Sequence, residues 1–251
     1  MKKLKVTVIT PVLNGYKTIM DCIESVQKQD YGNVEHIIID GGSTDGTIEL
    51  LKERNLKFVS EQDCGIYDAF NKGVALATGQ VINILNSDDY YTNNKVISRV
   101  IDIFEREGCD LVHGLAEQID EFDRMIWVIG ADVTKEILLN KMKVAHPTVF
   151  VSRSVYQNHG NFSVGFMLAA DHEFLLRVWD KIKSKFIHET LVNMRNGGAS
   201  TSQVKLSYRE SLSAVILHGQ SLPVAFARYY WELFKQYCII LPLRKLGYQK
   251  T

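Results

Sequence analysis

Residues 81–89, Val81-Ile82-Asn83-Ile84-Leu85-Asn86-Ser87-Asp88-Asp89, join a short apolar run directly to a pair of carboxylates. An apolar run of this length is typical of a strand buried on both faces of a parallel sheet. Three more such runs lie upstream, at 4–10, 34–40 and 57–61. Segments with helical spacing separate them, at 19–26, from Thr47 onward and at 67–77. The pattern predicts an α/β fold with a mostly parallel sheet flanked by helices.

Acidic side chains stand where the predicted strands end: Asp40, Asp63, Asp88 and Asp89. Open parallel sheets bind ligands outside the carboxyl ends of their strands, so these residues are the first site candidates. Carboxylates gathered at one edge repel one another unless a cation or the donors of a ligand compensate. Oxygen ligands of this kind suit Mg²⁺ or Mn²⁺. The alternative makes Asp40 a turn residue and Asp88-Asp89 part of a solvated loop.

Composition places the chain among ordinary globular proteins. It has 251 residues, 46% hydrophobic and 23% charged, with 29 basic and 29 acidic side chains. General nucleic-acid binders carry an excess of basic residues, and this chain has a net charge of zero. No nucleic-acid partner is therefore expected. The four cysteines form no C-x-x-C pair, which argues against a zinc knuckle and against a disulfide framework. No stretch reaches the roughly 18 apolar residues of a membrane-spanning helix.

The second half of the chain is less regular. A helix is predicted at 96–107, and further helices at 135–140, 171–179 and 204–218. Short strands are predicted at 111–114, 125–129, 148–151 and 191–194. Near the start of the chain, Thr18 and Asp21 match a capping box that opens the first helix. These patterns divide the chain into a nucleotide-binding half at 1–90, a second half at 91–218 and an appendage at 219–251.

The appendage has the character of an amphipathic helix. Aromatic and aliphatic side chains recur at helical spacing, namely Phe226, Tyr230, Leu233, Phe234, Tyr237 and Leu241. Five basic residues and one acidic residue lie between Pro223 and Thr251. A basic, aromatic helix suits the surface of an anionic bilayer, where rings lie at headgroup depth. The alternative is a helix packed on the domain or on a second subunit, and the oligomeric state stays open.

Other nucleotide-binding and hydrolytic sites are not indicated. A dinucleotide fold requires G-x-G-x-x-G after the first strand, whereas this chain has Thr10-Pro11-Val12-Leu13-Asn14-Gly15. The segment Gly15-Tyr16-Lys17-Thr18 has one residue too many for a P-loop. The histidines show no H-E-x-x-H spacing, which argues against a zinc hydrolase.

Four motifs, in this order, resemble those of family 2 glycosyltransferases. They are residues 8–14 (VITPVLN), residues 38–47 (IIDGGSTDGT), Asn71-Lys72-Gly73 with Gly79, and residues 85–89 (LNSDD). The resemblance covers about residues 4–200 and is strongest before Tyr90. It implies the GT-A fold, a single α/β domain that binds a nucleotide sugar in its first half and an acceptor in its second. It also implies a metal-dependent reaction with inversion at the sugar.

The resemblance assigns roles to eight residues of the first half. Donor-binding roles fall to Thr10, Pro11, Asn14, Asp40, Asp63, Lys72 and Asp88. Among them, Asp40 is expected to accept a hydrogen bond from the base, typically uracil, and Lys72 to act near the phosphates or the sugar. Asp89 is expected to bind Mn²⁺ or Mg²⁺, which offsets charge on the departing diphosphate.

The general base is expected from the second half, because inversion requires a base on the face opposite the leaving group. Residues 169–177, AADHEFLLR, are similar to the acidic motif of the family at a helix start, and we assign Asp171 as the base. The family more often has Glu-Asp where this chain has Ala170-Asp171. Glu173 is therefore a rival, although residues two apart on a helix diverge by about 200°. His146 resembles a residue that faces the acceptor.

Taken together, the sequence predicts an inverting, metal-dependent glycosyltransferase. It would move a sugar from a nucleotide-diphosphate donor, a UDP-sugar by resemblance, to a hydroxyl of a lipid-linked glycan in bacterial polysaccharide or O-antigen assembly. The expected location is the cytoplasm, or the cytoplasmic face of the inner membrane through the appendage. The alternative is a non-catalytic nucleotide-sugar-binding subunit that recruits a partner to the membrane. A nucleotidyltransferase would require a Gly-rich, Arg-containing loop after the first strand, which is absent.

Overall fold

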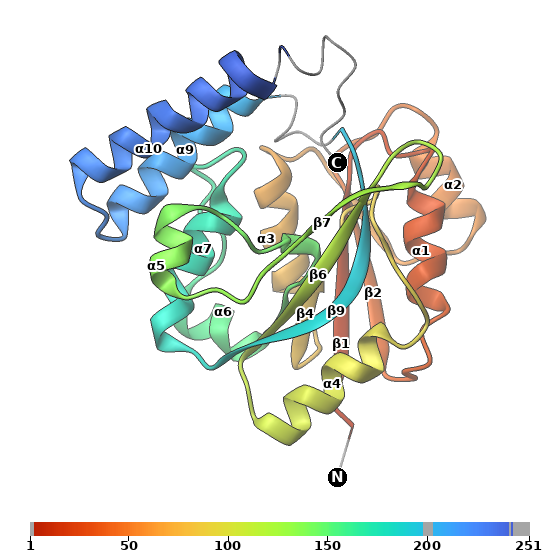
Figure 1. Cartoon of the computed structure of the whole chain (residues 1–251). Helices are drawn as coiled ribbons and strands as arrows, with labels where there is room; N and C mark the ends of the chain where they lie inside the picture. Colours follow the sequence, from red (N-terminus) through yellow and green to blue (C-terminus); the bar gives the residue numbers. More distant parts are fainter. Residues whose placement is uncertain (1–2, 198–202, 241, 243–251) are drawn as a thin grey trace.

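A single sheet of nine strands organises the computed structural model, which describes residues 3–197, 203–240 and 242 (Figure 1). Four parallel strands of the first half lie in the order β3 (Phe58–Ser60), β2 (Val34–Asp40), β1 (Val6–Val12) and β4 (Val81–Ile84). The helices between them are α1 (Ile19–Gln27), α2 (Thr47–Glu53) and α3 (Ile66–Leu76). The predicted parallel α/β arrangement of the first half is confirmed.

Helices cover both faces of these strands because the strands are apolar on both sides. All seven residues of β1 are buried. On one face Ile9 and Ile82 pack with Phe70 and Val74 of α3. On the other face, the apolar side chains of β1 pack with α1 and with α4 (Val96–Glu107). Parallel strands buried on both faces are typical of this architecture.

Two glycines allow α3 and its following loop to approach the sheet closely. A Cβ at Gly73 would lie 2.3 Å from the Ile9 side chain, and one at Gly79 would lie 2.7 Å from the backbone nitrogen of Thr7. No larger residue fits at Gly79 unless the backbone moves. These two positions of the Asn71–Gly79 motif therefore serve packing.

The second half extends the sheet by mixed pairing. β8 (Phe150–Ser152) lies antiparallel to β4 and to β6 (Leu111–Ile119), and β9 (Ser184–Arg195) runs parallel to β6. β7 (Met125–Ile129) pairs with β6, and β5 (Tyr90–Tyr91) pairs with β9. The strands predicted at 111–114 and 191–194 were too short. The register of β6 against β9 shifts near Gly114, and this irregularity interrupts the alternation by which long strands are detected.

Apart from α4, the helices of the second half lie together on one side of the sheet (Figure 1). They are α5 (Lys135–Asn140), α6 (Arg153–His159), α7 (Ala170–Val178), α9 (Val204–Leu217) and α10 (Leu222–Phe234). Short turns η1 (His146–Thr148) and η2 (Trp179–Lys181) complete this part, and α10 continues into the π-helix η3 (Lys235–Ile240). Neither α6 nor β5 was predicted. The predicted capping box was wrong, because the Thr18 side chain makes no cap hydrogen bond to α1.

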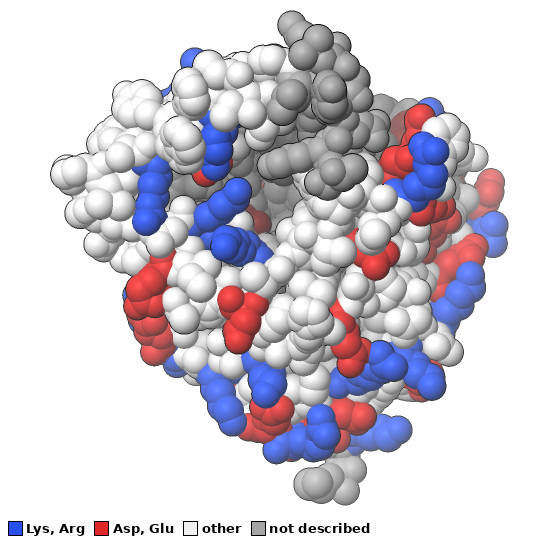
Figure 2. Space-filling model, viewed as in Figure 1, with Lys and Arg blue, Asp and Glu red and all other residues white. Residues whose placement is uncertain are grey.

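Helices α9 and α10 form a hairpin whose outer face is apolar and exposed. The exposed fraction is 63% for Tyr230, 55% for Trp231 and 50% for Phe234, while Ala225 is the buried residue of α10. Figure 2 shows a largely uncharged surface over the hairpin, whereas charged side chains gather over the lower part of the same face. Within the described residues, no helix combines the length and apolarity needed to cross a membrane. Of the predicted amphipathic series, Leu241 falls outside them.

Candidate functional site

Two loops at the carboxyl end of the parallel strands are hydrogen-bonded to each other, and a third lies against them. The Asn14 side chain accepts a hydrogen bond of 2.9 Å from the Thr44 N–H, and the Asn14 N–H donates to Ser43 Oγ at 2.7 Å. Asn14 has a φ of +54°, which an asparagine tolerates better than most residues. A Cβ at Gly15 would lie 3.2 Å from Ser87 Oγ, so this loop also lies against residues 86–89. Asn14 is thus an exposed residue that organises the edge.

Asp40 is buried and holds the turn that follows β2. Its carboxylate accepts hydrogen bonds from the N–H groups of Gly42 and Ser43 and from Ser60 Oγ at 2.7 Å. None of its surface is exposed. Asp40 therefore has the turn role that was considered as the alternative. For Asp40 to accept a hydrogen bond from the base of a nucleotide, the turn would have to open around its carboxylate.

Asp63 and Lys72 belong to the neighbouring loop. The Asp63 carboxylate accepts from the Gly65 N–H at 3.0 Å, and a Cβ at Gly41 would lie 2.5 Å from it. Asp63 is half-buried and lies against the Asp40 turn. Lys72 Nζ pairs with Glu61 at 3.1 Å and with Asp68 at 3.3 Å. Lys72 thus connects α3 to Glu61 in the preceding loop, and its positive charge is already paired with the two carboxylates.

Thr10 and Pro11 lie in β1 and not at the surface of the edge. The Thr10 hydroxyl is bonded to His36 Nε2 at 2.9 Å and contacts Cys22 Sγ at 3.4 Å. Both residues are buried. In this conformation neither side chain is exposed at the edge of the sheet. They support the loop that carries Asn14.

The pair Asp88 and Asp89 is the electrostatically unusual feature of the edge. Burial raises the pKa of the Asp88 carboxyl. Burial and the neighbouring Asp88 charge raise the pKa of Asp89 well above its ordinary value. Asp89 is 2% exposed and accepts one hydrogen bond of 3.0 Å from the Asn86 side chain. A buried carboxylate next to a half-buried one favours a bound cation, which would offset both the cost of burial and the repulsion between the two charges.

These residues fit a small divalent cation. Within the described part of the chain, the buried Asn86 Oδ1 has no hydrogen-bond partner, and it lies on the same side chain that donates to Asp89. All the available donors are oxygens, which Mg²⁺ and Mn²⁺ prefer. No group of three His, Cys, Asp or Glu side chains close enough to hold a metal occurs among residues 3–197, 203–240 and 242. A cation here would depend on one or two carboxylates and on the phosphates of a ligand, as Mg²⁺ commonly does.

Arg195, at the end of β9, is a site residue that the sequence reasoning missed. Its Nη1 donates to the Asp88 carbonyl oxygen at 3.1 Å, and its Nη2 pairs with Asp21 at 2.7 Å. Its guanidinium lies 5.0 Å from the centre of the Tyr90 ring. The positive charge of Arg195 partly opposes the rise in the pKa values of Asp88 and Asp89. The sequence signal that could have indicated Arg195 is its position as a basic residue directly before the Asn196-Gly197 turn.

Asp171 lies on α7 and is joined to the donor half through Tyr67. The Tyr67 hydroxyl donates to Asp171 Oδ1 at 3.0 Å. Tyr67 is the second residue of α3, which begins just beyond the carboxyl end of β3. Burial, and then the Asp171 charge, raise the pKa of Tyr67 well above its ordinary value, so the phenol stays a donor. The contact places Asp171 beside the edge that carries the other acidic residues.

An aromatic wall surrounds this contact. The His146 ring stacks on Phe70 with centroids 5.4 Å apart and meets the Phe162 ring edge-on at 5.7 Å. Burial lowers the pKa of His146, and the Asp171 charge acts in the opposite direction. Asn71 fixes Phe162 by two hydrogen bonds, from Nδ2 to the Phe162 carbonyl at 2.9 Å and from the Phe162 N–H at 3.0 Å. The predicted acceptor-side His146 thus lies close to Asp171.

Glu173 is engaged elsewhere. Its carboxylate binds Arg177 at 3.0 Å and His218 Nε2 at 3.0 Å, and it is only 7% exposed. Arg177 also donates to the Asn161 carbonyl at 2.7 Å, so this group braces α7 against its neighbours. Asp171 is half-exposed by comparison. Between the two carboxylates that sequence reasoning left as rivals, Asp171 is the accessible one.

Comparisons with known proteins agree with this geometry. Residues 7–148 match the family described as glycosyl transferase family 2. A PGL/p-HBAD biosynthesis glycosyltransferase of Mycobacterium bovis is 29% identical over 233 residues, covering 88% of this chain and 89% of the relative. An uncharacterized glycosyltransferase of Mycobacterium tuberculosis is 33% identical over 178 residues, 68% of each chain.

Solved structures share the fold at low sequence identity. S. aureus TarS in complex with UDP-GlcNAc superposes with a TM-score of 0.71 and 17% identity, covering 94% of this chain and 73% of TarS. A mannosyltransferase of Pyrobaculum calidifontis, in complex with GDP-Man and Mn²⁺, gives a TM-score of 0.67 and 15% identity over 93% of this chain and 70% of that one. The sheet and its flanking helices are therefore those of the GT-A fold, as the sequence motifs predicted.

Proposed function

Because the chain belongs to glycosyl transferase family 2, we propose that it transfers a sugar from a UDP-linked donor to a hydroxyl group with inversion, using Asp171 as the base. The observation that carries this proposal is the Tyr67–Asp171 hydrogen bond, which fixes an accessible carboxylate of the second half beside the acidic edge of the first. A donor site and a base on opposite sides of one edge is what inversion requires.

The proposed donor site is the edge formed by residues 12–16, 41–46, 61–65 and 86–89. UDP and UDP-GlcNAc bind to TarS, which shares this fold, and this supports a uridine donor. Asn14 is the exposed member of the predicted donor set and Asp88 is half-buried, while Asp40 and Asp63 shape the turn after β2. Asn14 and the turns that it bonds would recognise the nucleotide, and Asp88 would face its ribose or sugar.

Asp89, with Asn86 Oδ1, would hold Mn²⁺ or Mg²⁺. When bound, the cation supplies Lewis-acid stabilisation of the charge that develops on the diphosphate. The mannosyltransferase of P. calidifontis was solved with Mn²⁺, which supports the choice of metal. Arg195 adds a fixed positive charge beside the Asp88–Asp89 turn, and such preorganised charge favours departure of an anionic leaving group.

The base acts on the acceptor. Its carboxylate takes the proton of the acceptor hydroxyl, the oxygen forms a bond to the anomeric carbon, and the bond from that carbon to the phosphate oxygen breaks with its electrons. Tyr67 holds the carboxylate in its orientation throughout, because its phenol remains protonated.

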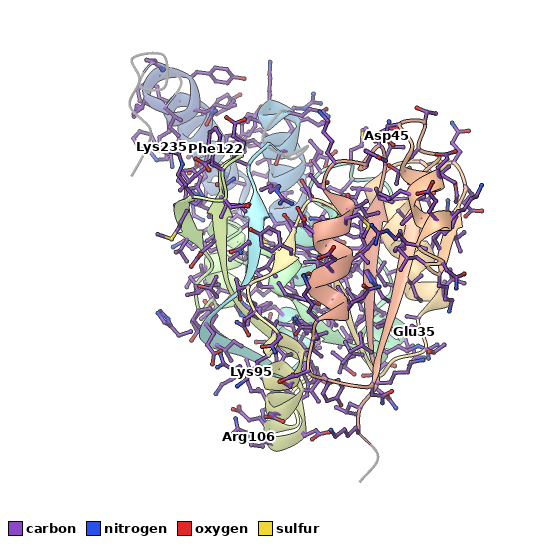
Figure 3. All side chains as sticks on the ribbon, turned by 90° about the vertical axis from the view of Figure 1, so that its right-hand side faces the viewer. Glu35, Asp45, Lys95, Arg106, Phe122 and Lys235 are labelled. Atoms are coloured by element: carbon purple, nitrogen blue, oxygen red, sulfur yellow. The ribbon has the colours of Figure 1, made fainter. Side chains whose placement is uncertain are left out.

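We propose that the acceptor is a glycan on a lipid carrier and that the α9–α10 hairpin binds the bilayer. Figure 3 shows Asp45, of the 41–46 loop, at the same end of the molecule as Lys235 and Phe122, while Lys95 and Arg106 lie toward the other end. Phe122 is 67% exposed, and the hairpin exposes Tyr230 and Trp231. An apolar surface at the end that carries the site suits an enzyme that receives its acceptor from a membrane.

The test of the donor proposal is calorimetric titration with UDP, GDP and dTDP, each with and without Mn²⁺. The parent protein is compared with Asp89→Ala and with Asp102→Ala, an exposed carboxylate on α4, as the matched control. We expect Mn²⁺-dependent binding of UDP that is lost in Asp89→Ala and kept in Asp102→Ala. Equal UDP affinity in all three proteins would contradict the assignment of Asp89. Donor binding without transfer to any glycan acceptor would favour the non-catalytic subunit instead.

A further inference from the structure

The helix that carries Asp171 has no cap of its own. α7 begins at Ala170 with Ala169 as its N-cap residue, and no side-chain hydrogen bond caps it there. The backbone N–H groups where a chain enters a helix require partners, which Ser, Thr, Asp or Asn usually supply locally. An alanine pair cannot do so. The orientation of the first turn of α7 therefore depends on a group from outside the helix.

That group is Glu210 on α9. Its Oε1 accepts from the Met167 N–H at 2.9 Å, and its Oε2 accepts from the N–H groups of Leu168 at 2.7 Å and Ala169 at 3.0 Å. Three consecutive amides are thus held by one carboxylate that lies 41 to 43 residues away in the chain. Hydrogen bonds to a charged acceptor are stronger than neutral ones. A negative charge at a helix N-terminus is also favourable.

A second contact joins the same two helices. His218, directly after α9, binds the Glu173 carboxylate at 3.0 Å, and Glu173 belongs to the first turn of α7. Glu210 therefore holds the chain that enters α7, and His218 holds its first turn. Asp171 lies between these two attachment points, and its own partner, Tyr67, comes from α3 on the other side. The Glu210 charge contributes to the raised pKa of Tyr67, as expected of a carboxylate close to that contact.

We propose that Glu210 is a positioning residue, through which the α9–α10 hairpin holds Asp171 against Tyr67 in the orientation required for proton abstraction. The inference rests on the proposed function of Asp171 as the base. It gives α9 a role in catalysis although no residue of α9 belongs to the matched family segment, which ends at residue 148. It also ties the base to the hairpin whose apolar face is exposed beside the site.

The physical reason is the sensitivity of proton transfer to geometry. A displacement of a reacting group by about 1 Å can lower a rate by about 100-fold. Loss of Glu210 leaves three N–H groups without their partner, and the entry to α7 must then shift toward water or another acceptor. Asp171 is two residues from Ala169 and moves with it. Within the described residues, none of the hydrogen bonds of Glu210 goes to the proposed donor loops 12–16, 41–46, 61–65 and 86–89.

The experiment compares the parent protein with Glu210→Ala, Glu210→Gln and Ser213→Ala. Ser213 is an exposed residue of α9 whose hydroxyl bonds only to the Arg209 carbonyl within the described residues, which makes it the matched control. Hydrogen–deuterium exchange is measured over residues 166–176. Release of UDP from UDP-GlcNAc, with water in place of the acceptor, gives kcat and KM, and titration with UDP gives the affinity.

We expect Glu210→Ala to exchange faster over residues 166–176 and to lower kcat by about 10- to 100-fold, while KM and UDP affinity stay within twofold. Glu210→Gln keeps one acceptor oxygen and should recover part of both effects, and it carries the test if Glu210→Ala does not fold. Parent kcat in both variants, or a parallel loss of kcat and UDP affinity, would overturn the proposal. Asp171→Asn in the same assay separates the claim about the base from the claim about Glu210. If Asp171→Asn retains the parent kcat, the proposed base is wrong. If Asp171→Asn is inactive while both Glu210 variants keep the parent kcat, only the role of Glu210 fails.

Discussion

Tyr67 and Asp171 are 104 residues apart in the chain, and the hydroxyl of the first donates a hydrogen bond of 3.0 Å to the carboxylate of the second. Tyr67 follows the loop after β3, in the half that carries the acidic edge, and Asp171 opens the helix that was predicted to carry the base. This one contact joins the proposed donor and acceptor halves at the place where transfer would occur.

Tyr67→Phe should lower the rate of sugar transfer about tenfold, because the variant lacks the hydroxyl that holds the Asp171 carboxylate in its orientation. The measurement is kcat for sugar transfer, with UDP affinity measured on the same protein. Tyr156→Phe is the matched control, because Tyr156 is buried in the same aromatic cluster and makes no side-chain hydrogen bond within the described residues. A kcat equal to that of the parent in Tyr67→Phe would contradict the role of Tyr67.

Asp89→Asn should stabilise the metal-free protein at neutral pH while abolishing metal-dependent UDP binding. The folded-state pKa of Asp89 is raised by burial and by Asp88. For an acid whose pKa is raised on folding, the cost is absent below the unfolded value of about 3.9 and fully present above the folded value. Removing the charge removes that cost. The measurement is the free energy of unfolding at pH 7 with EDTA, and a less stable Asp89→Asn would contradict the electrostatic account.

Added Mn²⁺ should raise the stability of the parent protein but not that of Asp89→Asn. A cation that binds the folded state alone raises its stability by mass action. The parent protein should therefore gain thermal stability with Mn²⁺ and UDP together, and Asp89→Asn should gain none. A similar gain in both proteins would place the cation elsewhere.

Stability should also fall as the pH drops below about 6.5, because of His36. Burial lowers the pKa of His36 to about 4, and its ring is bonded to the buried Thr10 hydroxyl. A base whose pKa is lowered on folding stabilises the native state fully above its unfolded pKa, and this contribution is lost as the pH falls toward the folded value. His36→Gln should flatten the unfolding free energy between pH 6.5 and pH 4, by up to about 3 kcal/mol. An unchanged pH dependence would show that His36 is not responsible.

The bilayer proposal is tested by sedimentation with vesicles. Parent protein should sediment with phosphatidylglycerol vesicles and much less with phosphatidylcholine, because the exposed rings of α10 are accompanied by the exposed basic residues Lys205 and Arg209 of α9. Trp231→Ser combined with Phe234→Ser should lose most of this binding. Leu76→Ser is the matched control, since Leu76 is exposed near the amino end of the sheet, close to Gly79 and Thr7. Equal vesicle binding by all three proteins would show that the hairpin does not bind the bilayer.

The regular half of the fold was predictable because its signals are local. The runs that form β2 and β4, and the segments that form α1 and α4, carry their spacing in the sequence itself. The motifs around Asp40 and Asp88 then indicated the site. β6 and β9 were underestimated, because a register shift near Gly114 and polar residues such as Glu117 break the alternation.

The site was predictable in part. Asp88 and Asp89 were proposed from their position after a strand, and Asp171 and His146 from the family resemblance, and the structure places Asp171 and His146 close together. Thr10 was assigned to the donor pocket, and the structure describes its side chain as buried and bonded to His36. The roles of these residues in binding and catalysis stay predictions. Arg195, Tyr67 and Glu210 were missed as site residues, because each acts through a partner more than 40 residues away.

The central claim is that Asp171 is the base of an inverting transfer. The most direct measurement is the rate of sugar transfer by Asp171→Asn at saturating donor, with UDP affinity measured on the same preparation. We predict transfer at background level with UDP affinity unchanged, and a product of inverted anomeric configuration from the parent enzyme. Transfer by folded Asp171→Asn at the parent rate, or a product with retained configuration, would contradict the account.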